Sequence, residues 1–163
     1  MEVIITILEG EEDQWWGDDR ERGVVTSGEW GMMSVLSGCI TVASAAIADA
    51  GIDCVDVVSG GVAAVVKAGN KGKENPTTLV LDPVPAEHQE ILAACIVAYL
   101  PARDEITDLW VKGDIGQNDS SKKAFVQSSL YEELTDNAVQ AALGSHRVLV
   151  AALKETADMK MGR

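Results

Sequence analysis

Apolar and polar positions along the chain switch repeatedly between strand-like and helix-like patterns. Residues 2–8 (EVIITIL) are β-branched and almost continuously apolar, which predicts a strand buried on both faces. Residues 57–66 (VVSGGVAAVV), 77–81 and 92–100 are three further apolar runs between turn formers. Residues 106–112 follow the last run after a proline-led turn, so they are predicted to be its hairpin partner.

Two segments have helical spacing instead. The first is predicted over residues 30–50, with Gly51 as a left-handed C-cap. Its apolar positions are Met33, Leu36, Ile40, Ala43 and Ile47. The second begins at Asp119 or Ser120 and runs to the C-terminal region, with Gly144 as a predicted weak point or kink. Strands and helices in this proportion predict the α+β class.

The most polar segment is residues 10–29, which contains EEDQWWGDDRERG and is predicted to be a solvated loop. Trp15 and Trp16 within it are an unusual pair for such a loop, because exposed tryptophans are enriched at interfaces. The loop is therefore a candidate for packing on a partner. Residues 67–76 (KAGNKGKENP) are predicted to be a second polar loop.

Length and charge narrow the function. With 163 residues the chain is one domain, long enough to bury a core built mainly from Ala, Val, Ile and Leu. Its formal net charge is −13, and the first 30 residues hold nine Asp or Glu against two Arg. Nucleic-acid binding draws its affinity from Lys and Arg that neutralise phosphates. The chain by itself is therefore predicted to bind RNA or DNA poorly.

Cysteine usage indicates a reducing compartment. Cys39, Cys54 and Cys95 are an odd number in apolar settings without CxxC spacing, so they are predicted to be small buried hydrophobes. We find no signal peptide, and no apolar run is predicted to approach the roughly 20 residues of a membrane span. We therefore expect a soluble protein without a membrane partner. Gly60 and Gly61 match no phosphate-loop motif and are predicted to mark a close backbone approach.

Five motifs in order resemble the RNase PH family. They are AAIADAGID (45–53), VVSGGVAAVV (57–66), LVLDPVPAEHQE (79–90), AYLPARDEITDLWVKGD (98–114) and the long C-terminal helix. Within that family the chain is most similar to eukaryotic RNA exosome ring subunits of the fungal mRNA-transport-regulator type. The resemblance implies the RNase PH-like (ribosomal protein S5 domain 2-like βαβα) fold. It also implies that residues 1–163 are the C-terminal two-thirds of such a domain, truncated at the N-terminus, with residues 10–29 as an insertion.

The same resemblance identifies where catalytic carboxylates are expected. Active members read LDxxYxED with a further Asp six residues later, and Asp82 and Glu87 match that pattern. The tyrosine position holds Pro85, the second Asp position holds His88, and the later Asp position holds Ala94. Alanine cannot ionise, and imidazole cannot supply an anion. We therefore predict no catalytic, cofactor or metal residues, and a turn or cap role for Asp82.

The function that the resemblance implies is a non-catalytic, structural subunit of the exosome ring, in 3′–5′ RNA processing and degradation. Its implied partners are other RNase PH-like ring subunits, S1/KH-type cap subunits, and RNA threaded through the assembled channel. The implied locations are nucleus, nucleolus and cytoplasm. Two alternatives stay open: an active phosphate-dependent 3′–5′ exoribonuclease, and a small α/β domain unrelated to the exosome. His88 is predicted to be a surface residue without a catalytic partner, and His146, within the long helix, is a weaker acid–base candidate still.

Overall fold

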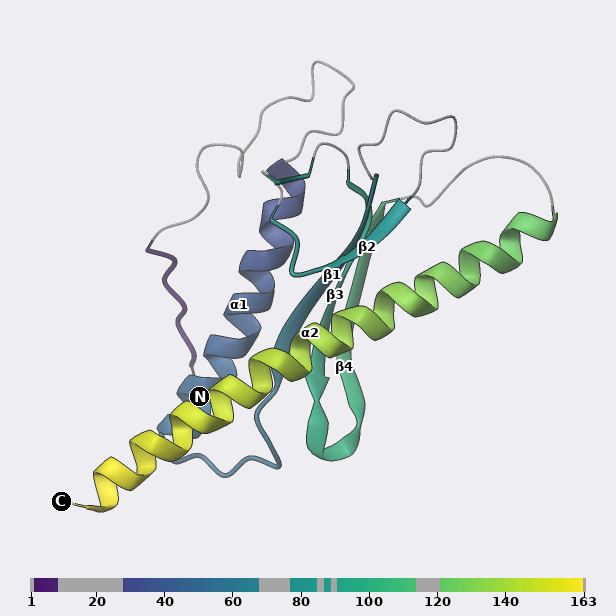
Figure 1. Ribbon diagram of the computed structural model, residues 1–163. Helices are drawn as coiled ribbons and strands as arrows, with labels where there is room; N and C mark the ends of the chain where they lie inside the picture. Colours follow the sequence, from purple (N-terminus) through teal and green to yellow (C-terminus); the bar gives the residue numbers. More distant parts are fainter. Residues whose placement is uncertain are drawn as a thin grey trace.

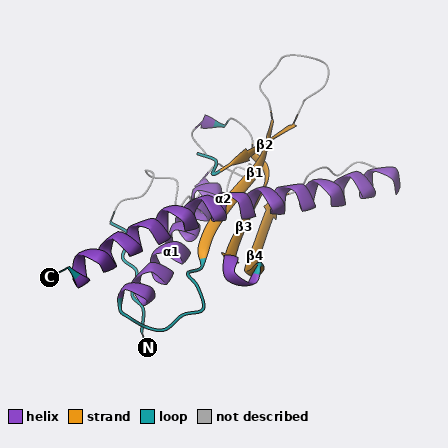
Figure 2. Ribbon diagram, turned by 60° about the horizontal axis from the view of Figure 1, so that its bottom comes forward, coloured by secondary structure: helices purple, strands orange, loops and turns teal. Residues whose placement is uncertain are grey.

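A computed structural model describes residues 2–8, 28–67, 77–84, 87–88, 91–113 and 121–162. Two helices cover opposite faces of a four-stranded antiparallel sheet with the strand order β2-β1-β3-β4 (Figures 1 and 2). The elements in chain order are α1 (Gly28–Asp49), β1 (Ser59–Lys67), β2 (Thr77–Leu81), β3 (Ile91–Leu100), η3 (Pro101–Arg103), β4 (Glu105–Gly113) and α2 (Ser121–Met161). The antiparallel sheet with its two helices confirms the predicted α+β class.

The first predicted helix is confirmed as α1, and Gly51 ends it as predicted. Gly51 has φ +74, a left-handed conformation that glycine adopts without steric cost. Its N–H donates to the Ala48 carbonyl at 3.0 Å, and the Ile52 N–H donates to the Ile47 carbonyl at 3.3 Å. This pair of hydrogen bonds is a Schellman motif, which satisfies carbonyls that the end of a helix leaves without partners.

Gly60 and Gly61 let both helices approach β1 closely. A Cβ on Gly60 would lie 2.7 Å from Ser37 Cα in α1, and one on Gly61 would lie 2.8 Å from Ala142 Cα in α2. Neighbouring residues of a strand face opposite sides of a sheet, so each glycine admits one helix. The predicted close backbone approach is confirmed.

The sheet core alternates between two apolar clusters. One faces α2 and includes Val65, Cys95, Val97, Leu134 and Ala138. The other faces α1 and includes Met33, Val62, Ala64, Ala94 and Ile96. Because side chains alternate along a strand, β1 and β3 contribute to both clusters. These two central strands are therefore buried on both faces, as their continuous apolar runs predict.

The predicted hairpin is formed by β3 and β4, which pair antiparallel around the η3 turn. Asp104 closes the turn with φ +52, and its N–H donates to the Pro101 carbonyl at 3.1 Å. The Tyr99 hydroxyl donates to the Asp104 carboxylate, which fixes the side chain at this left-handed position. This hydrogen bond raises the pKa of Tyr99, because the hydroxyl must keep its proton to donate.

Helix α2 runs for 41 residues across the sheet and extends past it (Figure 1). Leu134, Ala138 and Ala142 form its fully buried stripe at four-residue spacing. The helix continues without interruption through Gly144, so the predicted weak point does not break it. A Cβ at Gly144 would meet no atom within 4 Å.

Residues 2–8 contradict the predicted buried strand. They have no regular secondary structure, and their side chains are exposed, with Ile4 at 79% and Leu8 at 93%. The apolar, β-branched composition favours a strand, but a strand also needs a neighbour to complete its hydrogen bonds. Within the described residues, this segment runs beside α1 rather than beside a strand of the sheet (Figure 1).

The membrane prediction also needs correction at α1. Residues 32–49 form a helix that is long and apolar enough to cross a membrane by length and composition alone. The missed signal is the absence of any charged residue between Trp30 and Asp49. Ser, Thr and Gly interrupt the apolar residues in this stretch, so a search for an unbroken apolar run does not find it. One such helix is weak support for a membrane segment, although only 6% of this window is buried within the described residues.

The polar segment 10–29, with Trp15 and Trp16, falls almost wholly outside the described residues, as does most of the loop 67–76. The insertion therefore stays a prediction.

Candidate functional site

Asp82 lies where β2 ends, in the turn before Pro83. Its φ is +48, and its N–H donates to the Val62 carbonyl at 2.8 Å, which extends the pairing of β2 with β1 by one bond. A left-handed conformation is tolerated better by Asp than by most residues. The carboxylate itself is exposed. The predicted turn role for Asp82 is confirmed.

Asp82 lines a cleft of about 380 Å³, which lies between α1, the start of β1, the end of β2 and α2. Small and hydroxyl-bearing residues form most of its wall, among them Ser34, Ser37, Thr41 and Ser145. Asp82 is the one ionisable residue among the described residues that line it. The cleft therefore offers hydroxyl groups and one carboxylate, with no second acid or base from the described chain.

Hydroxyl groups of α1 already serve the backbone of β1 at this cleft. Thr41 Oγ1 accepts a hydrogen bond from the Gly60 N–H at 2.9 Å and donates to the Ser37 carbonyl at 3.1 Å. Ser44 Oγ accepts from the Val58 N–H at 2.8 Å. These bonds satisfy backbone N–H groups just before and at the start of β1, where β2 does not pair with it. Thr41 and Ser44 therefore have a structural role here.

Glu87 and His88 do not join Asp82 among the described lining residues of the cleft. Glu87 is exposed, and its backbone N–H donates to the Val84 carbonyl at 3.0 Å. His88 is half-buried, and its imidazole has no hydrogen-bond or ion-pair partner within the described part of the chain. Pro85 lies outside the described residues. The structure therefore shows no assembled set of acids around Asp82.

Ala94 lies inside the apolar cluster that faces α1, with 2% of its surface exposed. It pairs with Ala64 on β1 and with Lys112 on β4, and Met33 of α1 closes the same cluster. An ionised carboxylate here would lose its hydration among aliphatic side chains, which costs free energy even with Lys112 opposite it on β4. The pocket around residue 94 is built for a small apolar side chain.

Sequence reasoning missed a polar contact between the loop after α1 and helix α2. His146 Nε2 lies 3.2 Å from Asp56 Oδ1, and both side chains are mostly buried. Asp56 also accepts hydrogen bonds from the Val57 N–H at 2.8 Å and the Ala102 N–H at 3.1 Å. Burial alone raises the pKa of Asp56, but these hydrogen bonds, led by that of His146, outweigh it and hold the pKa below its ordinary value.

The sequence analysis assigns no partner to His146, whereas the structure places it against Asp56. The signal was available, because His146 follows Ala142 at the four-residue spacing of the buried stripe in α2. Asp56 joins this helix to the segment after α1 and to the η3 turn. Its role is to hold three segments together.

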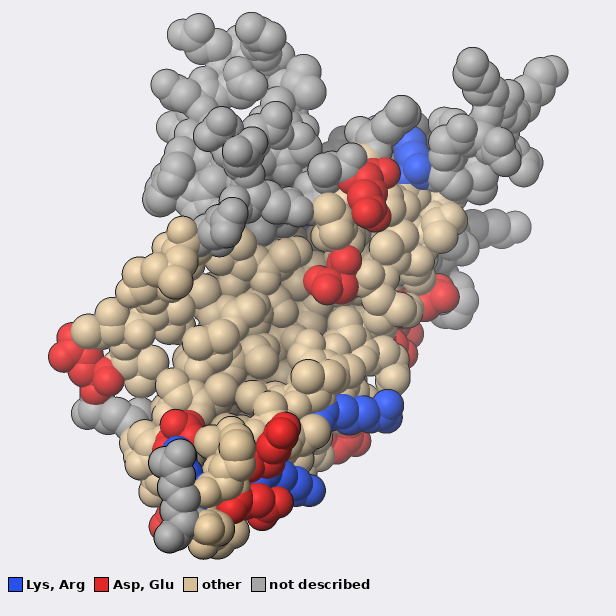
Figure 3. All heavy atoms as spheres, turned by 60° about the vertical axis from the view of Figure 1, so that its left-hand side comes forward, with Lys and Arg blue, Asp and Glu red and all other residues tan. Residues whose placement is uncertain are grey.

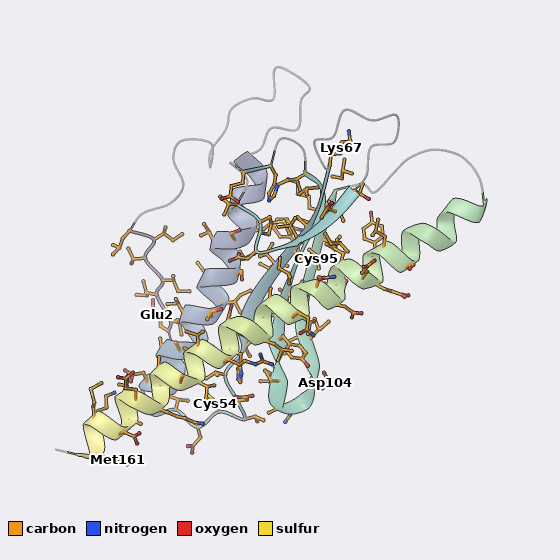
Figure 4. The ribbon with its side chains drawn as sticks, in the orientation of Figure 1. Glu2, Cys54, Lys67, Cys95, Asp104 and Met161 are labelled. Carbon is orange, nitrogen blue, oxygen red and sulfur yellow. The ribbon has the colours of Figure 1, made fainter. Side chains whose placement is uncertain are left out.

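The three cysteines are all free and differ in burial. Cys95 is fully buried in the sheet, and burial raises the pKa of its thiol (Figure 4). Cys39 is half-buried in α1, whereas Cys54 is exposed in the loop that follows this helix. The prediction of a buried cysteine is thus confirmed for Cys95 and wrong for Cys54, because the apolar neighbours of Cys54 in sequence are themselves exposed.

Within the described ranges, no three His, Cys, Asp or Glu side chains lie close enough to hold a metal ion. A second, open cleft of about 530 Å³ lies between the end of α1 and the C-terminal part of α2. Asp49 and Lys160 form an exposed ion pair there at 2.7 Å. Such a pair contributes little stability and is strongly screened by salt.

Comparison with known proteins gives one informative match. The chain is 50% identical over 157 residues to "Exosome complex component MTR3" of Chaetomium thermophilum, which covers 96% of this chain. The chain spans about half the length of that curated relative, with 49% of it covered. No protein-family model matches the chain.

Proposed function

We propose that this chain is a non-catalytic, structural subunit of the RNA exosome ring, of the fungal mRNA-transport-regulator type. In that role it supports 3′–5′ RNA processing and degradation without cleaving RNA itself. The observation that carries the proposal is the 50% identity to an exosome component over nearly the whole chain. The aligned region includes 157 of the 163 residues of this chain.

The pseudoenzyme part of the proposal is supported by the surroundings of Ala94. The RNase PH-like pattern expects a carboxylate at this position, but the chain has a buried alanine in an aliphatic cluster. His88 stands at another expected carboxylate position, and an imidazole cannot act as an anionic group there. Asp82 and Glu87 remain from the pattern, and Asp82 serves as a turn residue.

We further propose that the described fold is part of a larger RNase PH-like domain of the ribosomal protein S5 domain 2-like type. The outer face of α1 supports this, because Met32, Leu36 and Val42 on it are 39%, 40% and 57% exposed. Figure 3 shows a broad area of this face without charged side chains. Soluble proteins rarely leave large apolar patches uncovered. The twofold greater length of the relative supplies enough chain to cover it.

The proposed partners are other RNase PH-like ring subunits, S1/KH-type cap subunits, and RNA that passes through the assembled channel. The net charge of −13 supports a role in a ring wall, where basic surface comes from partners, over independent capture of RNA. We propose the nucleus, nucleolus and cytoplasm as its locations. We propose no membrane partner, because α1 packs Met33 and Ile40 onto the sheet core.

A phosphate-dependent degradation assay tests the absence of catalysis. The full-length protein is incubated alone with single-stranded RNA and inorganic phosphate, and released nucleoside diphosphate is measured. An active RNase PH-like subunit of proven activity is the positive control. We expect no release above the protein-free background. Release by this chain alone would support the alternative function, a phosphate-dependent 3′–5′ exoribonuclease.

Affinity purification of the tagged full-length chain from its own cells tests the structural role. We expect the other RNase PH-like ring subunits to co-purify in equal amounts, and to remain bound at moderate salt. Their absence from the purified material would contradict the proposed function and leave a small α/β domain of another role.

A further inference from the structure

Strand β4 forms one edge of the sheet and is exposed along almost its whole length (Figure 2). It pairs with β3 on one side, and among the described residues no strand pairs with its other side. An unpaired edge presents backbone N–H and C=O groups that can pair with another strand. A nine-residue edge is long for a soluble protein, which usually keeps such edges short.

Aliphatic side chains line the α2 face of this strand. Leu109 and Val111 lie opposite Val97 and Cys95, whose side chains belong to the cluster beneath α2. Directly opposite residues share a face of the sheet, so Leu109 and Val111 extend that cluster outward. Yet Leu109 is 49% exposed and Val111 is 38% exposed. The apolar layer therefore continues past the part that the helix covers.

The α1 face of β4 carries a large apolar residue as well. Trp110 lies opposite Ile96, which packs in the cluster beneath α1, and Trp110 is 40% exposed. Helices α1 and α2 pack mainly on β1 and β3, so within the described residues neither helix covers the two faces of β4 to a comparable extent. Tryptophan is enriched at the centres of protein interfaces.

The start of β1 also lacks a neighbour where β2 does not reach it, and this stretch is treated differently. Where β1 runs beyond β2, the Val58 and Gly60 N–H groups are satisfied by Ser44 and Thr41 of α1. Along β4, within the described residues, the Leu109 N–H donates to Oδ1 of the neighbouring Asp108 at 3.0 Å. This side-chain contact comes from β4 itself and not from a helix. Side chains of α1 thus satisfy the backbone where β1 has no strand beside it, whereas β4 has a local side-chain cap from Asp108 within the described residues.

We infer that β4 is an assembly edge that receives an extended strand from a neighbouring RNase PH-like subunit. Main-chain pairing satisfies the open edge, as in other cases of strand addition. The incoming strand must be apolar on both faces, because Leu109 and Trp110 project to opposite sides. It should also carry Lys or Arg opposite Glu105 and Asp108, which are exposed acids in a chain of net charge −13. This inference rests on the proposed function.

A matched pair of substitutions tests the inference. Leu109→Lys introduces a charge on β4, and Leu81→Lys makes the same change at a 48% exposed leucine on the opposite edge strand, β2. The full-length protein and both variants are titrated with each purified RNase PH-like ring subunit in turn. We expect Leu109→Lys to weaken the best binding by at least about tenfold and Leu81→Lys to change it by less than about twofold.

Hydrogen–deuterium exchange supplies a readout that needs no variant. In the unmodified protein, amides of residues 105–113 should gain protection when the binding subunit is added. Binding that leaves these amides unprotected, or that Leu109→Lys does not weaken, would overturn the inference while the proposed function stands. If the unmodified chain binds none of the ring subunits, both fail. Concentration-dependent self-association abolished by Leu109→Lys would identify a second copy as the occupant and also overturn it.

Discussion

His146 of α2 and Asp56 of the segment after α1 lie 3.2 Å apart, although 90 residues separate them in sequence. The same carboxylate accepts backbone hydrogen bonds from Val57 and from Ala102 in the η3 turn. The Asp56 side chain thereby links the segment after α1 to the η3 turn and to helix α2. Four hydrogen-bonded groups meet at a site where burial would otherwise make a charge unfavourable.

The first prediction concerns the stability that this contact provides. Asp56→Ala removes the acceptor of three hydrogen bonds and leaves the partly buried donors of Val57 and His146 without this acceptor. We expect a loss of about 1–3 kcal/mol in the free energy of unfolding, measured by urea denaturation. Asp53→Ala, a change at an exposed aspartate in the same segment, is the control and should stay within about 0.5 kcal/mol. Equal effects of the two changes would contradict the structural role of Asp56.

The second prediction concerns pH. The pKa of Asp56 is lower in the folded chain than its ordinary value of 3.8, so its contribution to stability is present above that value. The contribution is lost as the pH falls through the folded pKa, because protonation removes the charged acceptor. We expect Asp56→Asn to cost stability at pH 6 and to cost progressively less below about pH 4. The urea midpoint of each protein is measured across this pH range. A difference between the two midpoints that stays constant with pH would show that the charge of Asp56 is unimportant for stability.

The third prediction uses two glycines in different surroundings. Gly61→Ala places a methyl group 2.8 Å from Ala142 Cα, against backbone that cannot move without separating α2 from the sheet. We expect a destabilisation of about 2 kcal/mol or more, or failure to accumulate as folded protein. Gly144→Ala meets nothing within 4 Å and lies inside α2, so it should stabilise by up to about 1 kcal/mol. Thermal and urea unfolding of both variants measure the contrast.

The fourth prediction concerns the position where the RNase PH-like pattern expects a carboxylate. Ala94→Asp places a carboxylate in the apolar cluster around Met33, with Lys112 opposite it on β4, so the variant should lose about 1–3 kcal/mol of stability. It should release no nucleoside diphosphate from RNA with phosphate, because no second described acid accompanies Asp82 in its cleft. Ala46→Asp, at an exposed position in α1, is the control for the added charge. Phosphorolysis by a folded Ala94→Asp variant would mean that one substitution separates this chain from an active enzyme.

Much of the fold could be predicted because local pattern and tertiary contact agree there. The apolar runs of β1 and β3 are buried on both faces, and Gly60 and Gly61 lie where the two helices come closest. Gly51 ends α1 as its position after the last helical turn predicts. In these elements the local sequence already determines the neighbours that each residue needs.

The failures share a physical cause, which is dependence on distant partners. Residues 2–8 have the composition of a strand, but composition supplies no neighbour for their backbone groups. Cys54 has apolar neighbours in sequence, yet that whole segment is exposed. The Asp56–His146 contact joins residues 90 positions apart in sequence. Its signal in the sequence is that His146 continues the four-residue spacing of the buried positions in α2. At the candidate site, the burial of Ala94 follows from β1 and α1 as much as from β3 itself.

The last prediction distinguishes two thiols by their surroundings. Cys54 is exposed, whereas Cys95 is buried between the sheet and α2, and burial raises the pKa of the Cys95 thiol. The thiolate is the reactive form, so exposure and pKa both favour reaction at Cys54. With an aromatic disulfide reagent at pH 8, we expect Cys54 to react within minutes and Cys95 to react only on global unfolding. Cys54→Ser should therefore remove the fast phase, and Cys95→Ser should leave it intact. If a fast phase remains in the Cys54→Ser variant, a Cys39→Ser/Cys54→Ser variant tests whether Cys39 causes it. A fast phase in that double variant would belong to Cys95 and would show that the sheet opens beneath α2.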